Sequence, residues 1–440
     1  MYAVIDGGVP PVGRVRVSGA KNSATRLLAA ALLTDDSVEL SNFPTRLVDV
    51  GHKVKFCRDI GAEVTMDDVA ETITIDSASL ESRLLSRDQF DVPIRTTYLL
   101  AAGQLIRSGI ARIPYPGGCP IGPGNGGGRG YDLHLMVWEQ LGCTVAERAD
   151  HIEITAPKGL GGGKIDFPIS TVGGTENALL TASVASGQTE ISNAYITPEV
   201  NDLIGLLRRM GADITVSGTS HVRVNGRGGT LAGARMPVMT DRIEALTWIV
   251  FAILSGGELT VEGVPFEAME VPLIHIEKAG VDLFRNGTSI HVTPECLVSG
   301  EVQPFELACG SYPGVISDMQ AFYVLLALAG AGKSRIYDYR YPERIAFVSE
   351  LAKLVRGEHL TAKIGAITVQ GPALFMPGVA NSTDLRGSMA VVIAALCAKG
   401  RSVIQDVQMA LRGYNNLQSK LQQLGSRITV FEDANEPVNA

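Results

Sequence analysis

Two kinds of helical segment alternate along this chain. The first kind is amphipathic, ends in a glycine and runs into a short strand, and it recurs at intervals of about 70 to 80 residues. Its glycines are Gly61, Gly142, Gly211, Gly280, Gly357 and Gly425. Because helices commonly end at a glycine in the left-handed conformation, each copy predicts a surface helix with a glycine C-cap, followed by an edge strand.

The second kind of helical segment is apolar on nearly every face. Its copies span residues 22–33, 94–106, 175–187, 241–257, 317–332 and 383–400. A helix that is hydrophobic all round must be buried, yet the first turns of these segments carry charged residues. Because helix N-termini favour anions, we expect these turns to face something polar.

Six α/β units with one exposed and one buried helix each predict two domains of three units. A chain of 440 residues is also too long for one ordinary core. An ordinary α/β-sheet protein with coincidental spacing is the alternative at this point.

Composition narrows the class of protein. The chain is 45% hydrophobic and 19% charged, with a net charge of −8, which argues against nucleic acid and anionic membranes as partners. Its six cysteines show no metal-type spacing, which favours reduced thiols. The longest apolar runs fall short of the ~20 residues of a spanning helix, and the start lacks a signal-peptide pattern, so we expect a cytoplasmic protein.

Two segments of the first half carry candidate chemistry. Lys21 lies before a buried helix, where the macrodipole disfavours a cation unless an anion lies between them. A surface lysine with a buried stem is the alternative. Residues 113–132 are rich in Gly and Pro, which predicts a long binding loop with Cys119 in its middle and Arg129 beyond. Such a setting lowers a thiol pKa and makes it reactive; an inert loop thiol is the alternative.

The second half carries an aspartate at the start of a buried helix and several arginines in separate segments. Asp318 lies in the first turn of one such helix, and Arg344, Arg386 and Arg412 follow in separate segments. Each arginine alone is more often solvated or salt-bridged. Together they indicate guanidiniums that converge on a ligand with carboxylate and phosphate groups, which suit arginine geometry.

Eight motifs in order over nearly the whole chain carry a family resemblance. They are SGAKN at 18–22, PGGC at 116–119, RGYDLHL at 129–135, TVGGTEN at 171–177, TDRIEA at 240–245, SDMQA at 317–321, TDLRG at 383–387 and RGY at 412–414. This pattern resembles the UDP-N-acetylglucosamine enolpyruvyl transferase family, which belongs with the shikimate-phosphate enolpyruvyl transferases. The resemblance implies an α/β fold of two inside-out barrels, with six repeated βαβαββ units, three per domain. One domain would span 21–239 and carry the Cys119 lid loop, and the other 1–20 plus 240–440.

The resemblance also implies a role for each matching residue. The residues that would bind phosphoenolpyruvate are Lys21, Arg129, Arg344, Arg386 and Arg412. Asp318 would take the proton of the acceptor hydroxyl, Cys119 would act as general acid or gate product release, and Lys21 would join them in catalysis. The residues that would contact a uridine nucleotide are Asn22, Arg95, Tyr131, Asp132, Leu133, Thr171, Val172 and Gly173. The implied chemistry is addition followed by elimination of phosphate, with no metal or other cofactor.

Three departures from the family bear on the acceptor. The glycine loop is longer between Gly122 and Arg129, Ile169 stands where the family has a lysine that contacts the diphosphate, and Arg340 and Glu343 replace a small apolar residue and an asparagine. Loss of a diphosphate cation favours an acceptor with less phosphate. The chain then looks like the uridine monophosphate paralogues of peptidyl-nucleoside antibiotic pathways; the alternative acceptor is UDP-N-acetylglucosamine.

Three other functions compete with that of an enolpyruvyl transferase, and the sequence argues against each. Gly122, Gly124 and Gly127 match a dinucleotide-binding pattern, but no strand ends at the first glycine, as that fingerprint requires. An RNA 3′-phosphate cyclase would need a nucleotidylated histidine, for which only His134 has a suitable setting. A binding protein without activity would not require an acid and a base.

Cys119 is predicted to be the thiol most readily alkylated, with fosfomycin as a covalent inhibitor. Its glycine-rich loop near arginine favours exposure and thiolate. Mass spectrometry after limited alkylation measures the order of labelling. Modification of Cys57 or Cys143 while Cys119 stays inert would contradict this prediction.

Overall fold

The structure is a computed structural model that describes residues 1–81, 83, 85–118, 130–432 and 437–438. The chain divides into two compact units, each with its own hydrophobic core. Among the described residues, unit 1 comprises the segments that begin at Met1 and Thr240, and unit 2 comprises Gly19–Gly118 and Gly130–Met239. Unit 1 is therefore assembled from segments distant in sequence, with unit 2 between them along the chain.

Unit 2 has three sheets around buried helices. The strand orders, with bounds, are β13 (Ala234–Pro237), β3 (Ser37–Ser41), β5 (Thr72–Asp76) and β4 (Glu63–Asp67); β11 (Asp213–Ser217), β12 (His221–Arg227), β10 (Ser186–Ala194) and β9 (Lys164–Thr171); and β6 (Ile110–Pro114), β8 (His151–Thr155) and β7 (Thr144–Glu147). The helices are α1 (Lys21–Ala30), η1 (Ala31–Leu33), α2 (Val48–Asp59), η2 (Arg87–Phe90), η3 (Arg95–Leu100), α3 (Ala101–Ser108), α4 (Asp132–Gln140), α5 (Val172–Val184) and α6 (Pro198–Arg209).

Unit 1 also has three sheets among its described residues. The strand orders are β15 (Phe284–Asn286), β16 (Ser289–Val292), β14 (Glu258–Glu262) and β2 (Val12–Arg16); β17 (Glu306–Cys309), β18 (Lys333–Asp338), β20 (Ala366–Gln370) and β19 (Leu360–Lys363); and β21 (Val379–Asn381), β22 (Gly400–Gln405), β1 (Tyr2–Gly7), β23 (Arg427–Phe431) and β24 (Pro437–Val438). The helices are α7 (Arg242–Ser255), α8 (Phe266–Lys278), η4 (Ser317–Met319), α9 (Gln320–Leu328), α10 (Ala346–Ala352), α11 (Leu385–Cys397), α12 (Gln408–Leu411) and α13 (Leu417–Gln423).

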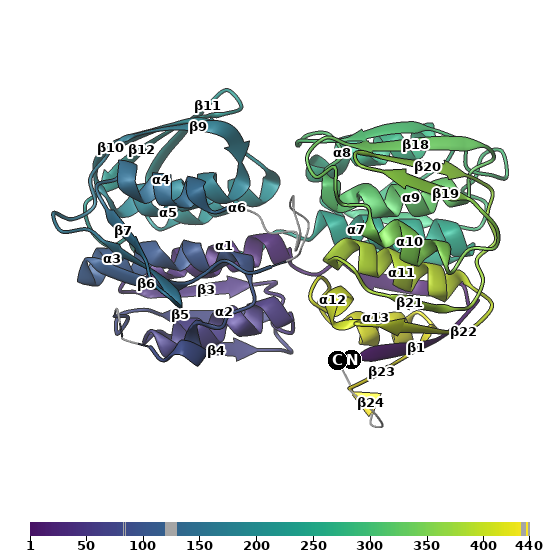
Figure 1. Cartoon of the computed structure of the whole chain (residues 1–440), viewed down its shortest axis with the longest axis horizontal. Coiled ribbons are helices and arrows are strands. Elements are labelled where there is room, and N and C mark those ends of the chain that lie inside the picture. The colour runs from purple at the N-terminus through teal and green to yellow at the C-terminus, as the bar shows by residue number, and fades with distance from the viewer. Residues whose placement is uncertain (82, 84, 119–129, 433–436, 439–440) are drawn as a thin grey trace. The chain divides into compact units, whose positions relative to one another are not determined.

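The helices predicted to be apolar all round form the cores. In unit 1, every residue of α9 is buried, and so are the α11 residues from Leu385 to Leu396. Figure 1 shows α7, α9 and α11 between the strands β18 and β20 on one side and β1 and β23 on the other. Burial on all sides requires apolar side chains at every position, which is the pattern that the sequence shows.

The glycines that end the amphipathic segments have the backbone conformation expected of them. Their φ angles lie between 84° and 105°, in the region that residues with a Cβ rarely adopt. After Gly61 and Gly211 the chain enters β4 and β11, which are edge strands of their sheets. After Gly425 it enters β23, which lies between β1 and β24 and is not an edge strand.

The predicted α/β class is confirmed as a mixed α/β fold with several sheets. Five sheets of the described residues have a parallel pair at one edge, such as β17 with β18, and antiparallel neighbours beyond it. The inside-out barrels, the six βαβαββ repeats and the exact domain limits stay predictions. Within the described part of the chain, no helix has both the length and the apolarity needed to cross a membrane.

Candidate active site

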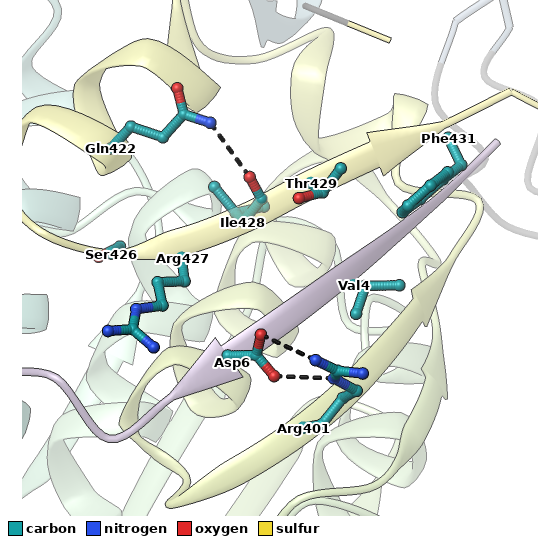
Figure 2. A pocket seen from close by; sticks show the side chains of 9 residues that line it. All are labelled: Val4, Asp6, Arg401, Gln422, Ser426, Arg427, Ile428, Thr429 and Phe431. Atoms are coloured by element: carbon teal, nitrogen blue, oxygen red, sulfur yellow. Dashed lines mark hydrogen bonds and ion pairs between the residues drawn. The ribbon is translucent and has the colours of Figure 1, made fainter. Parts of the chain in front are cut away.

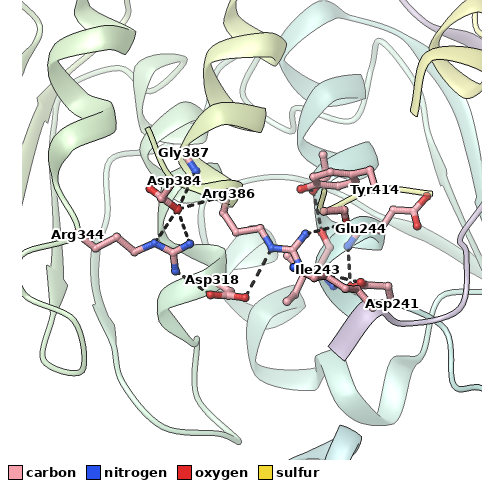
Figure 3. A network of polar contacts seen from close by, with 12 residues as sticks. Asp241, Ile243, Glu244, Asp318, Arg344, Asp384, Arg386, Gly387 and Tyr414 are labelled. Carbon is pink, nitrogen blue, oxygen red and sulfur yellow. Dashed lines mark hydrogen bonds and ion pairs between the residues drawn. The ribbon is translucent and has the colours of Figure 1, made fainter. Parts of the chain in front are cut away.

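The predicted base and two predicted arginines of unit 1 lie together, two of them at the starts of buried helices and one in a turn. Asp318 lies in η4, directly before α9; Arg344 lies between β18 and α10; and Arg386 lies in the first turn of α11. Figure 3 shows the three side chains pointing toward one another, with Asp318 between the two guanidiniums. The structure therefore brings together three residues that lie far apart in sequence.

Arg344 is held between two carboxylates. Its Nη1 donates to Asp318 Oδ1 at 2.7 Å, while its Nε and Nη2 donate to Asp384 Oδ1 at 3.0 and 2.6 Å. Asp384 also caps α11, because the same Oδ1 accepts from the backbone N–H of Arg386 and of Gly387 at 3.1 and 3.3 Å. One buried carboxylate thus fixes both an arginine and the helix that carries the next arginine.

Arg386 is surrounded by weaker contacts. Its Nε lies 3.6 Å from Asp318 Oδ2 and its Nη2 lies 3.9 Å from Asp241 Oδ2. Its Cζ lies 5.2 Å from the centre of the Tyr414 ring, and its Nη1 donates to the Gly413 carbonyl at 3.4 Å. The side chain is 1% exposed, so these contacts keep a buried guanidinium in place without a close ion pair.

The charges in this cluster stabilise one another. Burial opposes the charged form of Arg344, but Asp384 and Asp318 outweigh it and raise the pKa of the guanidinium. The pKa of Arg386 is also raised, against burial, by Tyr414, Asp241 and Asp318. Burial raises the pKa of Tyr414 to about 12, so its hydroxyl stays protonated. Two guanidiniums therefore stay charged in a poorly solvated region beside the carboxylates of Asp318, Asp384 and Asp241.

Arg412 and Asp318 differ from the two buried arginines in accessibility. Asp318 has a side-chain exposure of 28%, against 4% for Arg344 and 1% for Arg386. Arg412 is half-buried at the C-terminus of α12, directly before Gly413, whose carbonyl accepts from Arg386. Asp318 is thus the most exposed side chain of the Arg344–Asp318–Arg386 group.

In unit 2, the predicted nucleotide residues form two adjoining turns. Thr171 ends β9 and caps α5, accepting from Gly174 N at 3.2 Å, and Val172 and Gly173 begin the helix. A Cβ at Gly173 would lie 2.4 Å from the Tyr98 hydroxyl and 3.1 Å from His134 Cε1, so only glycine fits. His134 belongs to α4, whose first residues are the predicted contacts Asp132 and Leu133. The α4 and α5 turns therefore meet through Gly173.

Tyr131 and Arg95 are fixed at the start of α4. Arg95 donates from Nη2 to the Gly130 carbonyl at 2.6 Å, and the Tyr131 hydroxyl bonds Glu147. That bond is the main reason that the pKa of Tyr131 is raised to about 12. The segment that carries the predicted uridine contacts is therefore held from both sides.

Lys21 and Asn22 are the first two residues of α1. Lys21 Nζ lies 2.8 Å from Asp49 Oδ2, and its side chain is only 13% exposed. Asp49 supplies the anion that a cation at a helix start requires, and the lysine does not extend into solvent as the alternative predicted. The sequence analysis missed Asp49, because nothing in the local pattern links it to a residue in another helix.

Lys53 and His134 are buried ionisable groups beyond the predicted set. Lys53 donates to the Thr25 carbonyl and to Thr96 Oγ1, and burial lowers its pKa to about 7. It follows Val50 by three positions in α2, so helical spacing could have placed it on the apolar face. His134 stacks on Tyr98 and burial lowers its pKa to about 3. A buried, neutral ring of this kind does not suit the nucleotidylated histidine of a cyclase.

Two predicted site residues, Cys119 and Arg129, lie outside the described residues. The five described cysteines are all buried or half-buried. Burial raises the pKa of each; for Cys57, Cys143 and Cys397 the pKa is about 12. These thiols are poor nucleophiles, so alkylation of any of them should be slow.

A second feature of unit 1 lies away from these residues. Figure 2 shows a pocket beside β22, β1 and β23, where Arg401 Nε donates to Asp6 Oδ1 at 2.8 Å. None of the described site residues lines it. Over the described part of the chain there is also no group of three or more His, Cys, Asp or Glu placed to hold a metal ion.

The double role of Asp384 predicts a large loss of stability when it is removed. Asp384→Ala should lower the free energy of unfolding by about 3–5 kcal/mol, because it leaves a buried guanidinium with one partner fewer and uncaps α11. Asp384→Asn keeps a capping oxygen and separates the two effects. Urea unfolding measures both.

The matched control is Asp6→Asn, which breaks an exposed pair of the same unit. It should change the free energy of unfolding by less than about 1 kcal/mol. An Asp384→Ala loss as small as that of the control would show that the buried pair does not stabilise the unit.

Several known proteins resemble this chain over nearly its whole length. A family model described as EPSP synthase (3-phosphoshikimate 1-carboxyvinyltransferase) matches residues 5–421. The chain is 35% identical to UDP-N-acetylglucosamine 1-carboxyvinyltransferase of Acidobacterium capsulatum, over 98% of each chain, and 35% identical to the Hyphomonas neptunium protein of that name, over 96% and 97%. The crystal structure of the enolpyruvyl transferase NikO from Streptomyces tendae superimposes with a TM-score of 0.86 at 26% identity, covering 97% of this chain and 98% of NikO. These matches confirm the resemblance seen in the motifs: the chain belongs to the EPSP synthase family of enolpyruvyl transferases, enzymes that transfer a carboxyvinyl group.

Proposed function

We propose that this chain transfers the carboxyvinyl group of phosphoenolpyruvate to a hydroxyl of a uridine nucleotide, with release of phosphate. The observation that carries this proposal is the contact of Asp318 with Arg344 and Arg386 (Figure 3). A carboxylate of intermediate exposure beside two desolvated guanidiniums combines a general base with the cations that a carboxylate and a phosphate require.

The proposed reaction proceeds by addition and elimination. A proton adds to the methylene carbon of phosphoenolpyruvate, and the acceptor oxygen forms a bond to C2 while Asp318 removes its proton. The bond from C2 to the bridging oxygen then breaks, phosphate leaves, and the methyl carbon loses a proton to restore the double bond. Arg344 and Arg386 stabilise the negative charge of the carboxylate and the leaving phosphate. Lys21, Arg129 and Arg412 are proposed to share that role, and Cys119 to supply the proton or gate release.

The names of the relatives favour UDP-N-acetylglucosamine as the acceptor, rather than the uridine monophosphate that the sequence analysis favoured. Two relatives of 35% identity over nearly the whole chain carry that name. We therefore place the UDP-sugar first. The nucleotide would contact Asn22, Arg95, Tyr131, Asp132, Leu133, Thr171, Val172 and Gly173.

One specific observation supports uridine monophosphate as the second candidate. Ile169 lies on β9, two residues before the Thr171 cap of α5, and its side chain is 55% exposed. An exposed apolar side chain at this position cannot neutralise a diphosphate. The similarity to NikO, an enolpyruvyl transferase, is compatible with this candidate.

Phosphate release is expected to require both phosphoenolpyruvate and a uridine nucleotide, and to continue in EDTA. The assay compares UDP-N-acetylglucosamine, uridine monophosphate and shikimate 3-phosphate by kcat/KM. The UDP-sugar should have the highest value. Release only with shikimate 3-phosphate, or activity that EDTA abolishes and a divalent ion restores, would overturn the proposal.

Ile169→Lys should raise kcat/KM for the UDP-sugar roughly tenfold or more, because a charge-assisted contact contributes about 1.5–3 kcal/mol. The KM for phosphoenolpyruvate should not change. Val69→Lys places the same charge at a 93% exposed site of unit 2 and is the control. Equal effects of the two variants would remove Ile169 from the acceptor site.

Asp318→Asn should retain binding of both ligands and lower kcat by roughly 10² or more, the usual effect of removing a general base. Asparagine keeps the size of the side chain but accepts protons poorly. Asp282→Asn, at an exposed position of unit 1, is the control. Near-normal turnover by Asp318→Asn would assign the base elsewhere.

A further inference from the structure

Asp338 is a buried carboxylate that no step of the proposed reaction uses. It is the last residue of β18 and is 1% exposed. Its Oδ1 accepts three hydrogen bonds: from Ser317 Oγ at 2.8 Å, from Arg340 N at 2.9 Å and from Tyr341 N at 2.8 Å. Its Oδ2 is buried without a hydrogen-bond partner among the described residues.

The three donors belong to the two segments that meet at the proposed base. Ser317 directly precedes Asp318 in η4. Arg340 and Tyr341 begin the turn that leads to Arg344, and Arg344 N donates to the Tyr341 carbonyl at 3.0 Å. Asp318 and Arg344 then meet at 2.7 Å. The three hydrogen bonds of Asp338, the ion pair and the backbone between them therefore form a closed ring of contacts that includes Asp318 and Arg344.

The position of Asp338 is itself fixed by the sheet. β18 pairs in parallel with β17, where Asp338 lies opposite Cys309, and in antiparallel with β20. The backbone N–H of Asp338 donates to the Gly365 carbonyl at 3.1 Å, and Tyr339 N donates to the Cys309 carbonyl at 3.1 Å. A carboxylate at the end of a central strand is a rigid point from which to orient two loops.

We propose that Asp338 is a positioning residue that sets the placement of the base Asp318 through Ser317 and of Arg344 through the turn after β18. This inference rests on the proposed function, because it assumes that Asp318 and Arg344 act on the substrates. Asp338 does not reach the reacting atoms. It acts by holding two groups in one geometry, and misplacement by about 1 Å can cost 10²-fold in rate.

Ser317→Ala separates this role from simple support of the fold. It removes the link to η4 and leaves both bonds from the turn intact. We expect kcat to fall roughly tenfold while the KM for phosphoenolpyruvate stays within about twofold, because only the base loses its orientation. Ser317→Thr restores a hydroxyl and should recover most of the turnover.

Asp338→Asn and Asp338→Ala complete the test. Asparagine retains an oxygen that can accept from the same three donors, so it should keep kcat within a few-fold of the wild type. Alanine removes all three bonds and should impair both kcat and the KM for phosphoenolpyruvate. If alanine prevents folding, the comparison of Ser317→Ala with Ser317→Thr still decides.

The outcomes separate this inference from the proposed function. Absence of transfer by the wild type, with every acceptor tested, overturns both. An active wild type with an impaired Asp318→Asn variant, but normal kcat in Ser317→Ala, overturns only the positioning role. A Ser317→Ala variant that is destabilised in urea yet unchanged in kcat assigns Asp338 to structure alone.

Discussion

The placement of Arg344 between Asp318 and Asp384 is the interaction on which the geometry of the candidate site in unit 1 depends. A guanidinium with 4% exposure loses most of its hydration, and only close carboxylates can offset that loss. Asp384 does so while it caps α11, and α11 carries Arg386. The position of the second arginine therefore follows from the partner of the first.

The N-termini of helices are capped by different kinds of side chain in the two units. In unit 1 the caps of α7 and α11 are carboxylates, Asp241 and Asp384, and each lies near an arginine. In unit 2 the caps of α5 and α6 are the neutral side chains of Thr171 and Thr197. A carboxylate cap holds a cation, whereas a neutral cap leaves the positive end of the helix dipole for an anion. This difference is compatible with the proposed chemistry of unit 1 and with the proposed nucleotide contacts at the α5 turn of unit 2.

The sequence predicted the elements of this fold better than their partners. Apolarity on every face identified α9 and α11, because that property is local. The convergence of Arg344 and Arg386 was also expected, because several arginines in separate segments together indicated one ligand with carboxylate and phosphate groups. By contrast, the pairing of Lys21 with Asp49 and the bonds of Asp338 depend on which strands and helices become neighbours. The periodicity of apolar residues does not predict which elements become neighbours, nor how the strands are arranged into sheets.

The identity of the acceptor could not be predicted from the sequence for another reason. The apolar residue Ile169 suggests that a contact with a diphosphate is missing, but it does not show which group replaces that contact.

The central claim is that the carbon–oxygen bond of phosphoenolpyruvate breaks at C2 while cations hold the departing phosphate. The most direct measurement uses phosphoenolpyruvate with ¹⁸O in the bridging position, together with the acceptor and the wild-type protein, and mass spectrometry of both products. We predict that the label appears in the released phosphate and that the acceptor gains an unlabelled carboxyvinyl ether. Label retained in pyruvate, with phosphate attached to the acceptor, would show phosphoryl transfer and contradict the account.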